Sequence, residues 1–114
     1  MDGNNYFLWD RVGKIVSSFP GVHEKPAYGT PAFYVEKKLF TRLKEDGETL
    51  VVYNNDRDEW IASNPDVFFF TDHYKNYPAL LIDLKTVSKP DLEALLIISW
   101  KIRASKKILQ VFEK

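Results

Sequence analysis

The sequence predicts one α+β domain in which a mostly antiparallel sheet of about five strands is flanked by helices at both ends of the chain. Three observations lead to this class. Apolar residues recur at helical spacing near both ends. The sequence between them reads as strands, and short loops join the first three, which requires antiparallel pairing. The length of 114 residues suits one domain, so we take residues 1–114 as a single unit.

The first helix is predicted by five apolar side chains that share one face, at Leu8, Val12, Ile15, Val16 and Phe19. Pro20-Gly21 ends this helix. Residues 24–31 contain two prolines and a glycine, which forbid a helix and favour an extended path at a sheet edge.

Three strands are predicted next, at residues 32–35, 38–44 and 49–53. Strict alternation on the second strand places Leu39, Thr41 and Leu43 on one side and Phe40, Arg42 and Lys44 on the other. Asp46-Gly47 predicts a tight turn before the third strand. Both central positions of such a turn have a positive φ, which aspartate tolerates and glycine prefers.

A short helix is expected at residues 56–63, capped by Asn55 and ended by Asn64-Pro65. Two more strands follow at residues 67–71 and 79–84, separated by a polar and aromatic loop. The nearly continuous apolar run of the second is typical of a central strand.

The long helix that follows is capped by Ser88 or Lys89 and has Pro90 in its first turn. Its apolar arc is wide enough to predict burial against the sheet, and it comprises Leu92, Leu95, Leu96, Ile98, Trp100 and Ile102. Ser105 caps a last short helix, so the predicted order is α-β-β-β-α-β-β-α(-α).

The composition predicts a cytoplasmic protein without a membrane partner. The chain has no cysteine, which excludes a disulfide scaffold, a thiolate zinc site and a cysteine nucleophile, and which fits a reducing compartment. Its N-terminus lacks a basic segment followed by an apolar run, so we expect no signal peptide. The longest apolar run, residues 94–98, is too short to span a bilayer.

The charges balance, with 16 basic and 16 acidic residues, which counts against strong non-specific binding of nucleic acid. They are nevertheless segregated along the chain. Residues 99–114 hold five basic side chains and one acid, whereas residues 54–75 hold five acids and two basic side chains. A local basic patch near the C-terminus is therefore compatible with a neutral chain.

Several segments together resemble the MmcQ/YjbR-like family of small bacterial proteins. They are Pro20-Gly21-Val22, residues 24–33 (EKPAYGTPAF), Lys37-Lys38-Leu39-Phe40, Thr71-Asp72-His73-Tyr74 with Tyr77-Pro78, and residues 100–104 (WKIRA) with Lys106-Lys107. The resemblance covers about residues 5 to 112. It implies a compact antiparallel sheet with helices on one side, and DNA binding through exposed hairpins.

The chain departs from the family pattern in two places. Family members often place a basic residue just after the third strand, where this chain has Tyr53-Asn54-Asn55 and so lacks one phosphate contact. They often have proline before the paired lysines, where this chain has Ser105.

Two groups of basic residues are candidates for binding phosphates. The hairpin carries Lys37, Lys38, Arg42 and Lys44, but Glu36, Glu45, Asp46 and Glu48 lie in the same stretch and offset them, so a solvated, salt-bridged hairpin is the alternative. The second group is Lys106 and Lys107, which fall in the first turn of the last helix if Ser105 caps it, and Arg103 is placed to reach the same point. Solvated lysines are the alternative there.

Two aromatic clusters are candidates for other contacts. Tyr28, Phe33 and Phe40 form a base-stacking platform if their sheet face is exposed, whereas strand aromatics more often belong to the core. The loop cluster of Asp72, His73, Tyr74 and Tyr77 suits a ligand, and its alternative is a loop whose polar groups satisfy the backbone.

We expect neither a metal site nor a cofactor, because the two histidines are not at ligand spacing and no phosphate-binding or dinucleotide motif is present. The leading hypothesis is a monomeric, non-enzymatic module that binds DNA weakly and in a salt-sensitive manner. A protein-interaction or chaperone-like module that docks a partner protein is the alternative. A third hypothesis is a small-ligand domain that uses residues 72–77.

Overall fold

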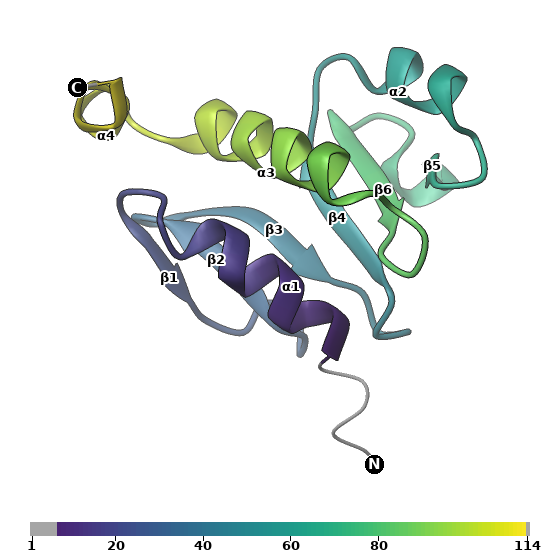
Figure 1. Ribbon diagram of the computed structural model, residues 1–114, viewed down its shortest axis with the longest axis horizontal. Coiled ribbons are helices and arrows are strands. Elements are labelled where there is room, and N and C mark those ends of the chain that lie inside the picture. The colour runs from purple at the N-terminus through teal and green to yellow at the C-terminus, as the bar shows by residue number, and fades with distance from the viewer. Residues whose placement is uncertain (1–6, 114) are drawn as a thin grey trace.

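The computed structural model describes residues 7–113, and within them one sheet has six strands, all paired antiparallel (Figure 1). The strands are β1 (Val22–Glu24), β2 (Ala32–Val35), β3 (Lys38–Leu43), β4 (Thr49–Tyr53), β5 (Phe68–Phe69) and β6 (Ala79–Asp83), in the spatial order β1-β2-β3-β4-β6-β5. The helices are α1 (Phe7–Val16), α2 (Arg57–Ser63), α3 (Lys89–Arg103) and α4 (Lys106–Glu113), with a 3-10 turn, η2, at Asp72–Tyr74. The α+β class and the order of elements are confirmed.

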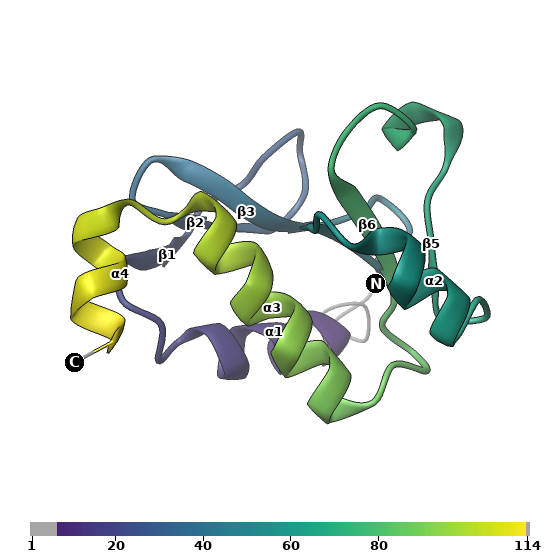
Figure 2. The same ribbon diagram turned by 90° about the horizontal axis from the view of Figure 1, so that it is seen from above.

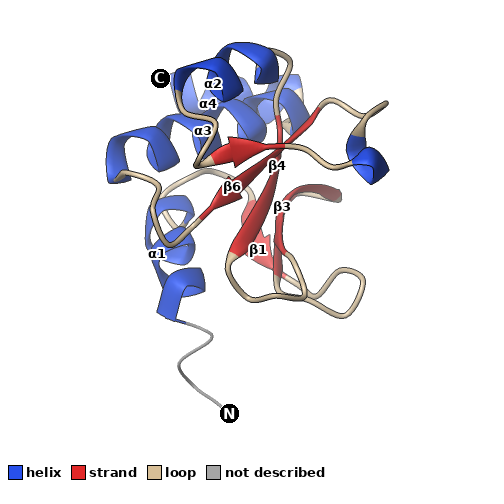
Figure 3. Cartoon of the chain, turned by 90° about the vertical axis from the view of Figure 1, so that its right-hand side faces the viewer, coloured by secondary structure: helices blue, strands red, loops and turns tan. Residues whose placement is uncertain are grey.

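The two longest helices, α1 and α3, lie on the same face of the sheet (Figure 2). Leu50 and Leu80 point into the core between α3 and the strands, and both are fully buried. Figure 3 shows the loop that contains η2 standing off from the strands, away from these helices. The opposite face of β3 and β4 is therefore covered only in part. Within residues 7–113, no helix is both long and apolar enough to cross a bilayer.

Trp100 is the largest fully buried side chain of the core, as its place on the apolar arc of α3 predicts. Its ring lies 5.6 Å from that of Phe19 and 4.8 Å from that of Phe112. Its indole N–H donates to the carbonyl of Pro20 at 3.1 Å, so the polar atom of the buried ring is satisfied. Ile102 lies beyond the edge of the arc and is 38% exposed.

The sheet has one strand more than the sequence predicts. Segment β1 pairs with β2 from Val22 opposite Val35 to Glu24 opposite Phe33. Three residues are too few for alternation to identify a strand, and only pairing to β2 defines this one. At the other edge, β5 has two residues, whereas residues 67–71 were predicted as a strand. The chain leaves the sheet after Phe69, and the ring of Phe70 lies 3.9 Å from the guanidinium of Arg57 instead.

A β-bulge makes the prediction of strict alternation on β3 wrong. Phe33 pairs with Thr41 and Tyr34 pairs with Leu39, which leaves Phe40 as an extra residue. Phe40 consequently joins the core with Leu43, although residues three positions apart face opposite sides of a regular strand. Beyond the bulge the side chains change face, so Arg42 comes to the same open face as Leu39.

The turn between β3 and β4 differs from the predicted one. Gly47 has a positive φ of 75°, but Asp46 does not. The carboxylate of Asp46 instead accepts hydrogen bonds from the backbone of Glu48 and from both the backbone and the hydroxyl of Thr49. Burial alone raises the pKa of Asp46, but these hydrogen bonds and the charge of Lys44 outweigh it, so its pKa lies below the ordinary value of 3.8.

Two helix boundaries also differ from the prediction. The N-cap of α2 is Asp56 rather than Asn55, and the side chain of Asn54 accepts from the backbone of Asp56 at 2.7 Å. Helix α1 ends at Val16, and Phe19 reaches the core from the turn that follows. Helix α3 begins as predicted, since the hydroxyl of Ser88 accepts from the backbone of Asp91.

We predict that Trp100→Ala lowers the free energy of unfolding by about 3 to 5 kcal/mol, because the change leaves a cavity in the centre of the core. The melting midpoint is then expected to fall by more than about 10 °C in a thermal scan. Trp60→Ala is the matched control, since Trp60 is only half-buried and is expected to cost less. A midpoint that Trp100→Ala leaves unchanged contradicts the burial.

We predict that Asp46→Ala destabilises the protein by about 1 kcal/mol at pH 7, because several turn hydrogen bonds are lost. The folded-state pKa of Asp46 is depressed, so its contribution is complete above the unfolded-state value of 3.8 and is lost as the pH falls below it. Urea unfolding at pH 7 and at pH 3 measures this. A difference between wild type and variant that is equally large at pH 3 contradicts the assignment.

Candidate functional site on the open face of the sheet

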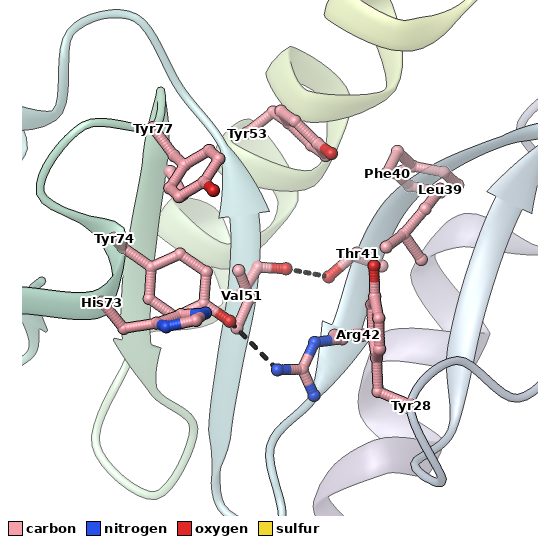
Figure 4. Close-up of a pocket in the computed structure, with 11 residues that line it drawn as sticks. Tyr28, Leu39, Phe40, Thr41, Arg42, Val51, Tyr53, His73, Tyr74 and Tyr77 are labelled. Carbon is pink, nitrogen blue, oxygen red and sulfur yellow. Dashed lines mark hydrogen bonds between the residues drawn. The ribbon is translucent and has the colours of Figure 1, made fainter. Parts of the chain in front are cut away.

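A concave site lies on the open face of β3 and β4, with a volume of about 430 Å³ (Figure 4). We call it the tyrosine pocket. It is bounded on one side by turn 27–30 and on the other by loop 70–78, and its floor is formed by strand residues. Its lining residues are Tyr28, Leu39, Phe40, Thr41, Arg42, Val51, Tyr53, His73, Tyr74, Tyr77 and Ala79.

Loop 70–78 presents three rings that contact one another. The rings of His73 and Tyr74 lie 4.8 Å apart, edge to face. Tyr77 lies 6.4 Å from each of them. Edge-to-face packing fixes ring orientation, so these side chains form a preformed aromatic side of the pocket. Tyr77 is nevertheless 59% exposed, which leaves much of its surface available for a ligand.

Arg57, the first residue of α2, holds this loop in place. Its Nη1 atom donates to the carbonyls of Tyr74, Tyr77 and Ala79 at 2.8, 2.8 and 3.0 Å. Its Nη2 atom donates to the carbonyl of Lys75 at 2.6 Å. Most backbone carbonyls of loop 70–78 take no part in an α-helix or a strand pair, so they need hydrogen-bond donors from elsewhere. The guanidinium of Arg57 supplies such donors. The sequence prediction missed this role, and the only local signal is that Arg57 lies between Asp56 and Asp58.

Arg42 joins the two sides of the tyrosine pocket (Figure 4). Its Nη1 atom donates to Thr30 Oγ1 at 3.2 Å and to the carbonyl of Leu43 at 3.4 Å, and its Nη2 atom donates to the hydroxyl of Tyr74 at 3.0 Å. Its guanidinium carbon lies 5.3 Å from the centre of the Tyr28 ring, within cation–π range. The structure thus brings Arg42 together with Tyr74 of the predicted loop cluster.

Tyr28 occupies an unusual backbone conformation. It has a φ of 54°, and Gly29 has a φ of 79°. Reciprocal backbone hydrogen bonds between Ala27 and Thr30, at 2.9 and 3.0 Å, close the turn. Two consecutive positive φ angles favour Asn-Gly, and a bulky residue in the left-handed region costs about 1 to 3 kcal/mol. The ring of Tyr28 is 80% exposed, so core burial does not offset that cost.

Ser99 and Arg103 of α3 close the pocket floor from behind, where β3 and β4 separate. The hydroxyl of Ser99 donates to the carbonyl of Phe40 and accepts from the backbone of Tyr53. Arg103 donates through Nε to the carbonyl of Leu39 at 2.9 Å, and its guanidinium carbon lies 4.5 Å from the Tyr53 ring. Arg103 therefore contacts the sheet in this structure, rather than the first turn of α4 that it was predicted to reach.

The candidate lysines lie at the end of the molecule where the β2–β3 turn approaches α4. Gly21 marks this approach, because an added Cβ there would lie 3.1 Å from Ile108 Cδ1 and 3.6 Å from Glu36 Cγ. Ser105 separates α3 from α4, and its hydroxyl accepts from the backbone of Ile108 at 3.3 Å. The exposed lysines at this end are Lys37, Lys38, Lys106 and Lys107, the last two in the first turn of α4.

The predicted base-stacking platform is divided between core and surface. Phe40 is fully buried, and Phe33 stacks on Trp9 at 4.7 Å in the core. Of that platform, Tyr28 alone presents an exposed ring to the pocket. Within the loop cluster, Asp72 is exposed outside the pocket lining, whereas His73, Tyr74 and Tyr77 belong to it.

Comparisons with known proteins agree with this fold. The YjbR family model matches residues 17–102. Uncharacterised proteins of Mycobacterium tuberculosis and Mycobacterium bovis are 29% identical to the chain over 121 aligned positions, which cover 91% of this chain and 94% of theirs. A crystal structure of a Deinococcus radiodurans protein with a DUF419 domain superposes with a TM-score of 0.72 and 18% identity, covering 87% of this chain and 80% of that one. That structural likeness shows the fold alone.

We predict that Arg57→Ala frees loop 70–78, because four carbonyls lose their shared donor. Amide hydrogen exchange at residues 72–79 is expected to accelerate at least about tenfold, while exchange in β3 stays as in the wild type. Arg57→Lys is expected to restore little, since an ammonium cannot reproduce the planar fork. Arg11→Ala is the matched control, because Arg11 binds the carbonyls of Leu84 and Val87 instead. Equal acceleration in both alanine variants contradicts the assignment.

Proposed function

The chain belongs to the YjbR family, and we propose that it is a nucleic-acid-binding module that takes a single strand of DNA across the open face of its sheet. The observation that carries the proposal is the tyrosine pocket, where exposed aromatic rings surround a fixed guanidinium. Proteins that bind single strands combine such rings with basic side chains along the strand path. The proposal describes a binding module rather than an enzyme.

The arrangement of cations along β3 supports this path. Lys37 and Lys38 lie at the start of the strand, and Arg42 and Lys44 lie at its other end. The distance from Lys38 to Arg42 along an extended strand is about 13 Å, since each residue advances about 3.3 Å. Arg42 lines the tyrosine pocket itself, whereas Lys37 and Lys38 lie at the other end of β3 and outside its lining. We propose that these two groups of cations bind successive phosphates of a strand whose base contacts the rings.

The shape of the site favours a single strand over a duplex. Loop 70–78 projects above the sheet (Figure 2), and the tyrosine pocket lies between it and turn 27–30. Bases within a duplex are stacked on their neighbours and cannot enter a pocket of this kind without leaving the stack. We therefore propose that single-stranded DNA binds more tightly than duplex DNA of the same length.

The proposal places the protein in the cytoplasm as a monomer. A chain without cysteine suits a reducing compartment. The strands at the two sheet edges, β1 and β5, have three and two residues, and such short edges offer little backbone for pairing with a second chain.

A partner-protein module is the second candidate, and one observation favours it. Ile102 near the end of α3 and Val111 and Phe112 in the last turn of α4 are 38%, 57% and 38% exposed. Exposed apolar side chains that form a patch are typical of protein contacts. Such binding depends on apolar burial and is expected to persist at high salt, whereas phosphate binding weakens.

We predict that a fluorescent single-stranded oligonucleotide binds with micromolar or weaker affinity at physiological salt, as non-specific contacts do. In anisotropy titrations at several salt concentrations, we expect the logarithm of the association constant to fall with the logarithm of the salt concentration with a slope of about −3. Each phosphate contact with a single strand contributes about −0.7, and the proposed path has about four contacts, one for each cation along β3. Lys37→Ala with Lys38→Ala is expected to make the slope shallower by about 1.4.

The double variant Lys14→Ala with Lys89→Ala is the charge-matched control, because both lysines are exposed and lie on helices α1 and α3. It is expected to leave the slope unchanged. If both double variants lost the same amount of affinity and of salt dependence, only the net charge of the protein would matter, and the proposed path along β3 would be refuted. Tight binding that survives several hundred millimolar salt also contradicts the proposal.

A further inference from the structure

The tyrosine pocket is suited to a ligand more specific than a strand backbone. Its volume of about 430 Å³ lies in the range of small-molecule sites. Its two sides are aromatic and its floor includes Leu39 and Val51, whereas the guanidinium of Arg42 lies among them. We propose that the pocket receives one unstacked nucleobase against the ring of Tyr28 while Arg42 binds a phosphate of the same nucleotide. This inference rests on the proposed function and refines its site.

The conformation of Tyr28 supports a role in contacting a ligand. The turn conformation favours asparagine at this position, with glycine next. A tyrosine here makes folding less favourable, and its ring is 80% exposed. Departures from local preference that the fold does not require tend to occur at functional sites. An exposed ring held at the edge of a pocket supplies the flat surface on which a base stacks.

Arg42 retains hydrogen-bonding capacity for an anion. A guanidinium has five N–H donors. Three bonds from Nη1 and Nη2 to residues of the described chain, 7–113, hold it in place. Its Nε–H and one Nη2 hydrogen have no partner within those residues. A guanidinium that is already oriented binds a phosphate oxygen with little further loss of freedom.

Glu45 competes with such an anion. Its exposed carboxylate lies 4.0 Å from Nη1 of Arg42, so it partly neutralises the charge that a phosphate needs. Removing that carboxylate charge is therefore expected to strengthen the binding of a phosphate. This effect separates a phosphate at Arg42 from a ligand held by the rings alone.

The aromatic side opposite Tyr28 is preformed. Tyr74 is fixed by its hydroxyl contact with Arg42 and by the ring of His73. The carbonyls of Tyr74 and Tyr77 are both held by Arg57. A planar ring that enters between two fixed aromatic sides is bound without ordering the loop first, which favours affinity. The ligand class is consequently a planar heteroaromatic ring that carries a phosphate, either as a free nucleotide or within a single strand.

The test uses the full chain with Tyr28→Asn and Tyr28→Phe. Asparagine suits the turn, so Tyr28→Asn is expected to keep or raise the melting midpoint while it removes the ring. In NMR titrations, adenosine monophosphate is expected to shift amides of residues 28, 42, 74 and 77. Tyr28→Asn is expected to weaken its binding about 5- to 150-fold, and Tyr28→Phe less than about twofold.

Further probes separate the parts of the ligand. Adenosine and inorganic phosphate are each expected to bind more weakly than the monophosphate. Glu45→Gln is expected to tighten binding of the monophosphate about 1.5- to 5-fold, but not that of adenosine. Glu36→Gln is the charge-matched control, because Glu36 lies in the β2–β3 turn beside Gly21, and it is expected to have no effect.

The outcomes distinguish this inference from the proposed function. Equal affinity of Tyr28→Asn and wild type for both the monophosphate and an oligonucleotide overturns the inference, and strand binding still stands if Lys37→Ala with Lys38→Ala weakens it. Shifts from inorganic phosphate that match those from the monophosphate also overturn it. A lower melting midpoint for Tyr28→Asn than for the wild type would show that tyrosine does not destabilise the turn, and this result counts against the inference. Binding of the oligonucleotide but not the monophosphate, lost in Tyr28→Asn, supports a base within a strand.

Discussion

The hydroxyl of Ser99 stands between β3 and β4, and the open face of the sheet depends on that placement. The register of these strands ends at Thr41 opposite Val52. The next pair would join Phe40 to Tyr53, but Ser99 bonds to both backbones instead. A fully buried hydroxyl that satisfies a donor and an acceptor removes the cost of leaving either unpaired. The strands can therefore separate there without loss of hydrogen bonding, and the pocket floor forms where they do.

The bulge at Phe40 and the separation of β3 from β4 act together. The bulge turns Phe40 into the core, and its carbonyl then meets Ser99. The same extra residue brings Arg42 to the open face, where it reaches Tyr74. Arg103 binds the neighbouring carbonyl of Leu39. A single irregularity in one strand thus determines both the contact with α3 and the position of the main cation of the site.

The sequence predicts those parts of the molecule that depend on local periodicity. The apolar arc of α3 gives its burial and that of Trp100, and turn residues separate the strands. The bulge at Phe40 could not be predicted, because a bulge is defined by pairing with β2 and leaves no local signature. The positive φ of Tyr28 was not predicted, because turns of this type favour asparagine rather than tyrosine at that position. The role of Arg57 depends on carbonyls of residues 74 to 79, which no spacing rule connects to α2.

The arginines bear on how strongly this neutral chain would bind nucleic acid in the proposed function. All four arginines, at positions 11, 42, 57 and 103, donate to backbone carbonyls of the fold. Apart from the N–H groups of Arg42 that have no partner within residues 7–113, surface contacts with phosphates would rest mainly on lysines, of which the chain has 12 against 16 acidic residues. Counterion release alone then gives little affinity. Base stacking depends on ring surface rather than on net charge. Under the proposed function, the exposed tyrosines of the pocket would therefore supply most of the binding free energy, and an unstacked base would be favoured over a duplex.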